Sequence, residues 1–270
     1  MTSMTGRSIK GFVIAGTDTG VGKTEVARAL CALLAGKGLR PLPLKPVETG
    51  VDQEGPADAL ALRAACGLGD EVPLDSVCPF QFKLPAAPLV AAEAEGKIVD
   101  LLVIERLVVQ AAEAQRPLVV ELAGGLLVPL ARETSRATLE QADAPDRAPV
   151  EVLVTNLDLA ERLGLPVVLV GRAGLGTLNH CALSVQALAG RGLNVLAIVL
   201  NRTRPDDDPT VATNPALLAE LTGLPVLGPG PYVADAAARP DRLAVHLSAL
   251  LRCTVVDTAG ARALRSAPSE

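Results

Sequence analysis

The amino-acid sequence predicts an α/β fold, a doubly wound domain with a mostly parallel sheet and helices on both faces, and two observations predict it. Short apolar runs alternate along the chain with longer stretches in which apolar residues recur at helical spacing. The apolar runs are continuous rather than alternating, which is typical of strands covered on both faces, as in a parallel sheet. Strand and helix therefore follow one another repeatedly, which is the pattern of a doubly wound fold.

Composition is consistent with one fold of this kind. The 270 residues are 49% hydrophobic and 20% charged, which favours a sizeable buried core over a disordered chain. Aromatic side chains make up only 1% of the residues, so alanine, leucine and valine must fill that core. The sequence shows neither a linker nor an internal repeat, and we predict a single domain over residues 1–270 with its core at about residues 11–252.

The predicted strands and helices follow from the apolar patterns. Strands are predicted at residues 12–15, 42–45, 118–121, 166–170 and 195–200, and helices at 22–37, 58–65, 100–115, 177–189, 214–221 and 241–251. Pro41 and Pro43 predict irregular pairing of the second strand, because proline lacks a backbone donor. Residues 132–149 are charged and lack a period, which predicts a surface loop, and the small polar residues 260–270 predict a frayed tail.

Charge and cysteine usage argue against several classes of protein. The net charge is −5, so the chain lacks the basic footprint of a protein that binds nucleic acid or an anionic membrane. The apolar residues 117–131 are interrupted by charge, glycine and proline, and residues 1–10 lack the apolar core of a signal peptide. Five scattered cysteines without a Cys-x-x-Cys pair indicate free thiols in a reducing compartment. We therefore expect a cytoplasmic protein.

A glycine-rich segment from Gly16 to Thr24 follows the first predicted strand and opens the first predicted helix. A phosphate-binding loop requires this context, because backbone N–H groups at a helix start can wrap the phosphates. Lys23 supplies positive charge to the β- and γ-phosphates, and the Thr24 hydroxyl can ligate Mg²⁺. Five residues separate Gly16 from Gly22, one more than usual. A plain turn with an exposed lysine is the alternative, but we predict that a nucleoside triphosphate binds here.

Further motifs follow the loop in order. They are Lys45-Pro46-Val47-Glu48-Thr49-Gly50, Asp58-Ala59-Leu60, Glu121-Leu122-Ala123-Gly124-Gly125, Gly174-Leu175-Gly176-Thr177-Leu178-Asn179-His180, Asn201 and Pro231-Tyr232. Together with the loop, these motifs resemble those of the dethiobiotin synthetases from about residue 12 to residue 232. One phosphate loop indicates only a nucleotide-binding protein, whereas several ordered motifs are much more specific.

The resemblance implies a P-loop NTPase fold and the ATP-dependent ligase reaction of that family, which belongs to biotin biosynthesis. CO₂ and one amine of 7,8-diaminononanoate form a carbamate, whose oxygen attacks the γ-phosphate of ATP. The second amine then closes the ureido ring and gives dethiobiotin, ADP and phosphate. Because an anion attacks an anion, the transfer needs concentrated positive charge, which Lys23, Lys45 and Mg²⁺ would supply.

The resemblance also implies roles for individual residues. Lys45 and Lys23 would be catalytic; Thr24, Asp58 and Glu121 would ligate Mg²⁺; and Thr49 would bind the substrate. The nucleotide would contact Thr19, Gly20, Val21, Gly22, Lys23, Thr24, Glu25, Asp58, Glu121, Leu122, Ala123, Gly124, Asn201, Arg202, Pro231, Tyr232 and Val233, with Asn201 at the adenine edge. The carboxylate tail of the substrate would contact Gly176, Thr177, Leu178 and Asn179. In the family this last segment comes from the partner subunit, so a homodimer is implied.

Single residues also have simpler interpretations. Lys45 could be a surface lysine, and Asp58 could be a helix N-cap, alone or in addition to binding metal. Glu121 ends an apolar strand, where an unpaired charge is costly, which favours a functional role. Leu122 stands where the family has glycine, so its side chain could crowd the phosphates beside Glu121.

Other functions compete with this one. A cobyrinate-synthase-like ligase would need a glutaminase module, for which 270 residues leave little room. A ParA-like partitioning ATPase has an additional lysine early in the loop, where this chain has Gly16 and Thr17. A catalytically silent nucleotide-binding regulator would need fewer charged residues than the lysines and acids of these motifs.

Overall fold

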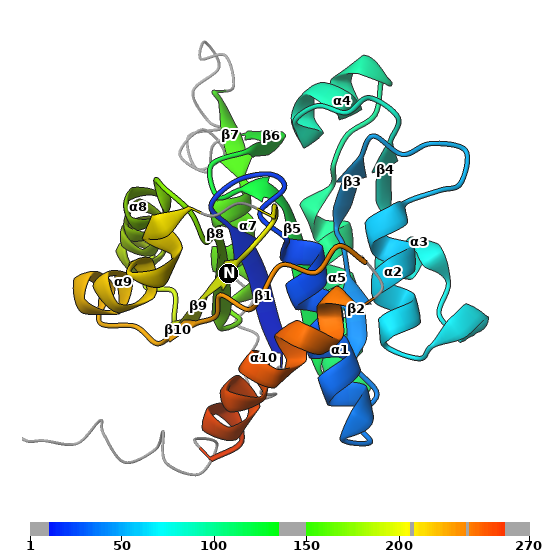
Figure 1. The fold of residues 1–270 in the computed structure, drawn as a ribbon. Helices are drawn as coiled ribbons and strands as arrows, with labels where there is room; N and C mark the ends of the chain where they lie inside the picture. Colours follow the sequence, from blue (N-terminus) through cyan, green and yellow to red (C-terminus); the bar gives the residue numbers. More distant parts are fainter. Residues whose placement is uncertain (1–10, 135–149, 206–207, 236–237, 257–270) are drawn as a thin grey trace, which may run out of the picture.

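A six-stranded parallel sheet forms the centre of the computed structural model, which describes residues 11–134, 150–205, 208–235 and 238–256. Its strands, in spatial order, are β10 (Val226–Leu227), β9 (Val195–Asn201), β8 (Val167–Arg172), β1 (Gly11–Gly16), β5 (Leu118–Gly125) and β2 (Leu42–Leu44). All neighbouring pairs are parallel, and helices flank the sheet (Figure 1). The predicted α/β fold with a mostly parallel sheet is confirmed.

Two hydrophobic layers, one on each face of the sheet, explain why the strands are apolar at every position. Val13 and Ala15 of β1 pack on one face, and Phe12 and Ile14 pack on the other. The first layer includes α5 (Leu101–Glu113), α7 (Asn156–Leu163), α8 (Thr177–Gly190) and α9 (Asn214–Thr222). The second includes α1 (Lys23–Gly36), α2 (Ala57–Ala65) and α10 (Arg239–Val256), with α10 lying along α1 (Figure 1). The doubly wound arrangement is therefore present.

Several small elements were not predicted from the sequence. Strand β3 (Val47–Thr49) pairs in parallel with β4 (Phe80–Phe82), and β6 (Pro129–Thr134) pairs antiparallel with β7 (Glu151–Thr155). Short helices are α3 (Leu74–Val77) and α4 (Pro88–Ala94), and 3₁₀ turns occupy Gly69–Glu71 and Pro209–Ala212. Strand β10 of the central sheet and helix α7 were missed as well. Except for α7, whose eight residues are amphipathic, each of these elements is too short to display a clear period in the sequence.

Two predictions about irregular segments are wrong. Residues 132–134 are not part of a loop but the end of β6, because Arg132, Glu133 and Thr134 pair with β7. Residues 135–149 and the predicted tail at 260–270 lie outside the described residues. Strand β2 pairs with β5 in regular register along its length, since it is the edge strand and Pro43 needs no donor on its open side.

The strand order positions a site at the carboxyl edge of the sheet. Strands β5 and β2 lie on one side of β1, and β8, β9 and β10 lie on the other. In open α/β sheets, ligands bind where the strand order reverses in this way. Among the helices that the structure describes, none combines the length and apolar character needed to cross a membrane.

Candidate active site

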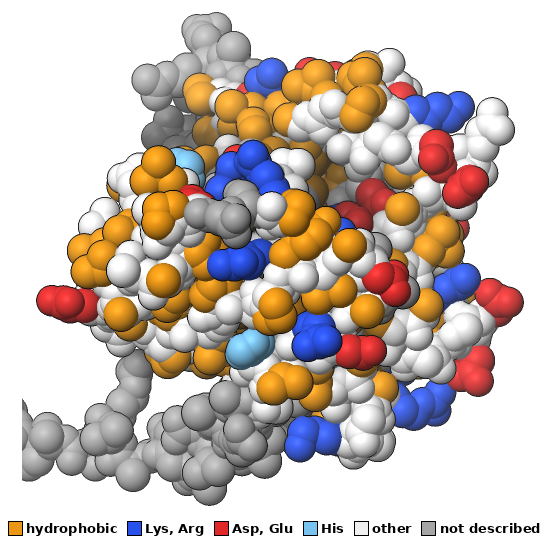
Figure 2. Space-filling view, in the orientation of Figure 1, with side chains coloured by type: hydrophobic (Ala, Val, Ile, Leu, Met, Phe, Trp, Pro, Cys, Tyr) orange, Lys and Arg blue, Asp and Glu red, His pale blue; other side chains and the backbone are white. Residues whose placement is uncertain are grey.

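A cavity of about 860 Å³ opens at the carboxyl ends of β1, β2, β5 and β9. Figure 2 shows it as a recess between the phosphate loop and the segment that contains β3 and α4. The cavity brings together most of the residues that the motifs indicated: Thr19, Gly20, Gly22, Lys23, Thr24, Glu25, Lys45, Thr49, Asp58, Glu121, Ala123, Gly124, Asn201 and Arg202. These residues come from distant parts of the chain, and the parallel sheet places them side by side.

The phosphate loop connects β1 to α1, as the sequence predicts. No side chain caps the N-terminus of α1, so its first N–H groups point toward the loop in the way an anion requires. Gly22 has a φ of +92°, and a Cβ there would lie 1.9 Å from Nδ2 of Asn201, so only glycine fits. Lys23 Nζ donates to the Asp18 carbonyl at 2.9 Å. Burial lowers the pKa of Lys23 to about 8, against the opposing charge of Glu121.

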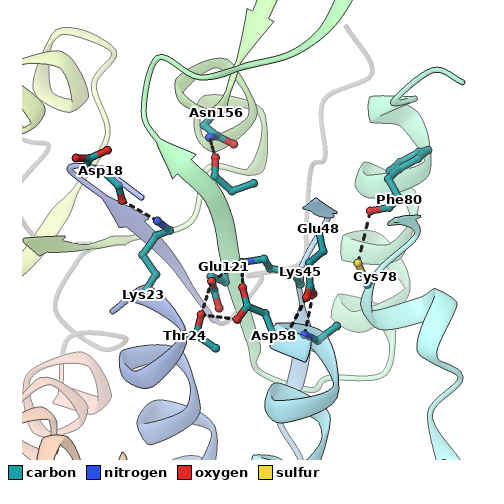
Figure 3. Close-up of polar contacts among 12 residues, drawn as sticks. Asp18, Lys23, Thr24, Lys45, Glu48, Asp58, Cys78, Phe80, Glu121 and Asn156 are labelled. Atoms are coloured by element: carbon teal, nitrogen blue, oxygen red, sulfur yellow. Dashed lines mark hydrogen bonds and ion pairs between the residues drawn. The ribbon is translucent and has the colours of Figure 1, made fainter. Parts of the chain in front are cut away.

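Two carboxylates hold the ammonium of Lys45, and the Thr24 hydroxyl contacts both of them (Figure 3). Lys45 Nζ donates to Asp58 Oδ2 at 2.7 Å and to Glu121 Oε1 at 2.5 Å. Thr24 Oγ1 lies 3.0 Å from Asp58 Oδ1 and 3.0 Å from Glu121 Oε1. The side chains of Lys45 and Glu121 are only 5% and 1% exposed. Lys45 is therefore not a surface lysine, and the simpler interpretation of this residue is wrong.

The electrostatics of this cluster favour the charged forms of Lys45 and Asp58 despite burial. Burial opposes the charge of Lys45, but Glu121 and Asp58 outweigh it and raise the pKa of Lys45 above its ordinary value. Burial likewise opposes ionisation of Asp58, yet Lys45 and the Thr24 hydroxyl hold the pKa of Asp58 below its ordinary value. Burial raises the pKa of Glu121 above its ordinary value, against the opposing effect of Lys45.

The same oxygens could hold a hard cation. Thr24, Asp58 and Glu121 offer a hydroxyl and two carboxylates, the donor types that such ions prefer. Glu121 Oε2 is buried and has no hydrogen-bond partner within the described part of the chain, which is costly unless a cation or water meets it. The described residues contain no group of three or more His, Cys, Asp or Glu side chains that could hold a metal alone. A cation here would need water or phosphate oxygens as further ligands.

Asp58 is not a helix N-cap. Helix α2 begins at Ala57, its N-cap is Pro56, and no side chain within the helix start caps it. The side chain of Asp58 instead points to Thr24 and Lys45. At the N-terminus of α2, the backbone N–H groups of Asp58 and Ala59 donate to the Glu48 carboxylate. The sequence gave no reason to single out Glu48.

Leu122 lies in the hydrophobic core rather than beside the phosphates. Its side chain is 1% exposed and belongs to the same apolar layer as Val47 and Leu130, whereas Glu121 and Ala123 line the cavity. Successive side chains of a strand point to opposite faces, so the neighbour of a site residue faces away from the site. The expected crowding by Leu122 is therefore wrong.

Some predicted residues do not line the main cavity. Val21 is buried beneath the loop. Pro231 and Val233 line a smaller hollow with Asn201, Arg202 and Arg239, and Arg239 lines both hollows. The Tyr232 ring centroid lies 5.8 Å from Cζ of Arg239. The predicted tail-binding residues Gly176, Thr177, Leu178 and Asn179 line neither hollow.

Asn156, which the sequence did not indicate, fixes the segment after Glu121. Its Nδ2 donates to the carbonyls of Ala123 and Gly125 at 2.5 and 2.8 Å, and the residue is 1% exposed (Figure 3). Gly124 packs between Thr19 of the phosphate loop and Val128. Asn156 therefore holds one wall of the cavity in place. An amphipathic pattern around residue 156 could have revealed α7 but not this contact.

The fold and the site define a P-loop nucleotide-binding protein of the α/β class. A family model described as an AAA domain matches residues 10–145 and 140–239. The ATP-dependent dethiobiotin synthetase BioD of Anaeromyxobacter dehalogenans (strain 2CP-C) is 44% identical over 245 residues, which is 90% of this chain and 100% of that protein. The chain belongs to the ATP-dependent dethiobiotin synthetase family.

Other relatives agree with this assignment. The synthetase of Anaeromyxobacter sp. (strain Fw109-5) is 46% identical and covers 86% of this chain and 94% of its own length. The synthetase of Thermodesulfovibrio yellowstonii is 35% identical, and the match covers 83% of this chain and 90% of that protein. Among solved structures, chloroplast FtsY from Physcomitrella patens matches with a TM-score of 0.44 and 16% identity, over 90% of this chain and 67% of that chain. The relatives named as dethiobiotin synthetases confirm the family resemblance of the motifs and the prediction of an ATP-dependent ligase of biotin biosynthesis.

Proposed function

We propose that the cavity performs the ring closure of dethiobiotin with Lys45 as the residue that contacts the reacting carbamate. CO₂ adds to one amine of 7,8-diaminononanoate, the carbamate oxygen takes the γ-phosphoryl group of ATP, and the second amine displaces phosphate as the ring closes. The observation that carries this proposal is the position of Lys45. It is a buried, charged lysine within reach of the phosphate loop, held by two carboxylates.

Positive charge is the main requirement of this reaction, because both reacting groups are anions. Lys23 would neutralise the β- and γ-phosphates, and Lys45 would neutralise the carbamate and the transferred phosphoryl group. Thr49 lines the cavity near Lys45 and would hydrogen-bond the diamine substrate. The adenine would lie near Asn201 and Arg202, against the backbone of residues 231–233 that lines the adjoining hollow.

Magnesium is part of the same proposal. Thr24, Asp58 and Glu121 would hold it, since their oxygens converge and Glu121 Oε2 is a buried acceptor with no partner among the described residues. The ion would supply neutralising charge to the β- and γ-phosphate oxygens. Two carboxylates and one hydroxyl suit Mg²⁺, which usually keeps water and phosphate ligands.

A homodimer would complete the site at the carboxylate tail of the substrate. Gly176 is the N-cap of α8 and offers no side-chain cap, so the first N–H groups of α8 suit a carboxylate. Leu175, beside it, is 79% exposed, and Leu127, Val152 and Leu153 are also exposed. Apolar surface of this kind favours an interface between subunits. Free, buried thiols support the expected cytoplasmic location, and the structure has them at Cys31, Cys66, Cys78 and Cys181.

Phosphate release from ATP, with Mg²⁺ and bicarbonate and with or without 7,8-diaminononanoate, tests the proposal. We expect release only when the diamine is present, together with dethiobiotin detected by mass. Phosphate release that the diamine does not change would mean that the cavity serves another acceptor, and the roles of Lys45 and Thr49 would have to be reassigned.

A further inference from the structure

Of the three residues proposed to hold the cation, Asp58 has the least support from its own element. Glu121 lies in β5, a strand with a neighbour on each side, and Thr24 lies in the first turn of the 14-residue helix α1. Asp58 lies in the nine-residue helix α2, which follows a turn at residues 52–55. The position of Asp58 therefore depends on how the start of α2 is held.

Glu48 holds the start of α2 from outside the helix. Its Oε1 accepts from the backbone N–H of Asp58 at 2.9 Å, and its Oε2 accepts from that of Ala59 at 3.0 Å. Glu48 is 7% exposed and lies in β3, three residues after Lys45 (Figure 3). A carboxylate at a helix N-terminus satisfies backbone donors and complements the helix dipole. Here it does so from a strand, because Pro56 offers no side-chain cap.

We propose that Glu48 is a positioning residue, which fixes Asp58 between Thr24 and Lys45 through the backbone of α2. One of the two N–H groups that Glu48 binds belongs to Asp58 itself. The backbone of Asp58 is therefore hydrogen-bonded directly to a residue of β3. Strand β3 begins two residues after Lys45. Glu48 therefore also fixes the position of Asp58 relative to Lys45. Glu48 also lines the cavity, but both of its carboxylate oxygens bind backbone N–H groups of α2, so we assign its effect to the position of Asp58.

The inference rests on the proposed role of Asp58 as a metal ligand, and it can be tested by ATP binding without turnover. The dissociation constant of ATP is measured with Mg²⁺ and with a chelator, for the wild-type protein, Glu48→Ala and Asp100→Ala. Asp100 is the control for the loss of a helix cap, because its carboxylate caps α5 at 2.9 Å from the Leu102 N–H and, unlike Glu48, it does not line the cavity. The thermal midpoint of each variant reports the loss of a cap.

We expect Glu48→Ala to weaken ATP binding about tenfold with Mg²⁺ and to leave it unchanged with the chelator, since a lost cap of about 1.4 kcal/mol corresponds to that factor. Asp100→Ala should lower the thermal midpoint about as much as Glu48→Ala does. It should change the dissociation constant of ATP neither with Mg²⁺ nor with the chelator. If Glu48→Ala is not recovered folded, Glu48→Gln replaces it. Glutamine keeps one acceptor oxygen, and about threefold weakening is then expected in Mg²⁺ alone.

Two results would overturn the inference. One is a Glu48 variant whose Mg²⁺-dependent ATP binding equals that of Asp100→Ala, because Glu48 would then only stabilise the fold. The other is equal weakening with and without Mg²⁺, because the change would then not act through the cation. The Mg²⁺ dependence of ATP binding by the wild-type protein distinguishes failure of this inference from failure of the proposed function. If its own ATP binding does not depend on Mg²⁺, the metal role of Asp58 fails.

Discussion

The residues of this site differ in how readily their roles can be predicted from the sequence. Lys45, Asp58 and Glu121 stand in recognisable motifs, and the structure brings their charged groups within hydrogen-bond distance. Glu48 and Asn156 could not be predicted, because each acts on backbone atoms 10 to 33 residues away. A side chain that binds distant backbone leaves no pattern in its own neighbourhood.

Replacing Lys45 by alanine should abolish turnover. The change removes the charge that compensates Glu121, so we also expect the free energy of unfolding to fall by about 3 kcal/mol. ATP binding should change less than about threefold, because the phosphate loop is untouched. Phosphate release, ATP titration and urea unfolding measure the three quantities. Lys37→Ala, at an exposed lysine after α1, is the control. Loss of ATP binding in parallel with turnover would contradict the assigned role.

The Asn156→Asp substitution keeps the size of the side chain but removes both donors. The carbonyls of Ala123 and Gly125 would then face a carboxylate, so we expect unfolding to become about 2 kcal/mol easier. The affinity for ATP should fall too, since this segment packs against the phosphate loop. Urea unfolding and ATP titration check both effects. Asn194→Asp, at an exposed asparagine, should change neither, and an unaltered Asn156→Asp protein would show that these bonds are dispensable.

Among the elements, the strands of the central sheet other than β10 were predictable, and those of the small sheets were not. The strands β1, β5, β8 and β9 are buried on both faces, and continuous apolar runs mark them in the sequence. Strand β7 is half exposed and short, so its residues give neither an alternating nor a continuous pattern. It exists because β6 provides a partner, which is a tertiary contact. Local sequence cannot specify such pairing.

The two ends of α1 offer a matched pair of glycine substitutions. Gly22→Ala should abolish ATP binding, because the new Cβ meets Asn201 and the positive φ is unfavourable for alanine. Gly36→Ala, at the other end, meets no atom within 4 Å and should raise the free energy of unfolding by up to about 1 kcal/mol. ATP titration and thermal unfolding measure these effects. Tight ATP binding by Gly22→Ala would mean that the loop can rearrange.

At the scale of the whole molecule, the sequence predicts the doubly wound architecture and the family. It does not predict the exposed apolar side chains, because exposure depends on the final packing. That residues 1–270 form one domain remains a prediction, as does the homodimer. Exposed leucines on the β6–β7 ribbon and before α8 are the features that favour the dimer.

A charge on the β6–β7 ribbon should separate the subunits. Leu153 is 51% exposed, and Leu153→Asp would place a carboxylate in the expected interface. Sedimentation velocity should show a dimer for the wild-type protein and a monomer for the variant, and turnover should fall because, in the proposed dimer, the tail-binding segment would come from the partner. Val245→Asp, on α10, is the control, since Val245 is also exposed. A fully active monomer would rule out a shared site.

The contact between Tyr232 and Arg239 has an optical consequence. The chain has one tyrosine and no tryptophan, so ultraviolet emission excited near 280 nm comes from a single ring. That ring lies 5.8 Å from an arginine that lines both hollows of the site. Any shift of Arg239 when a nucleotide enters would alter the surroundings of the fluorophore. Tyr232 is therefore an intrinsic fluorescent reporter beside the cavity, and no tryptophan emission overlaps its signal.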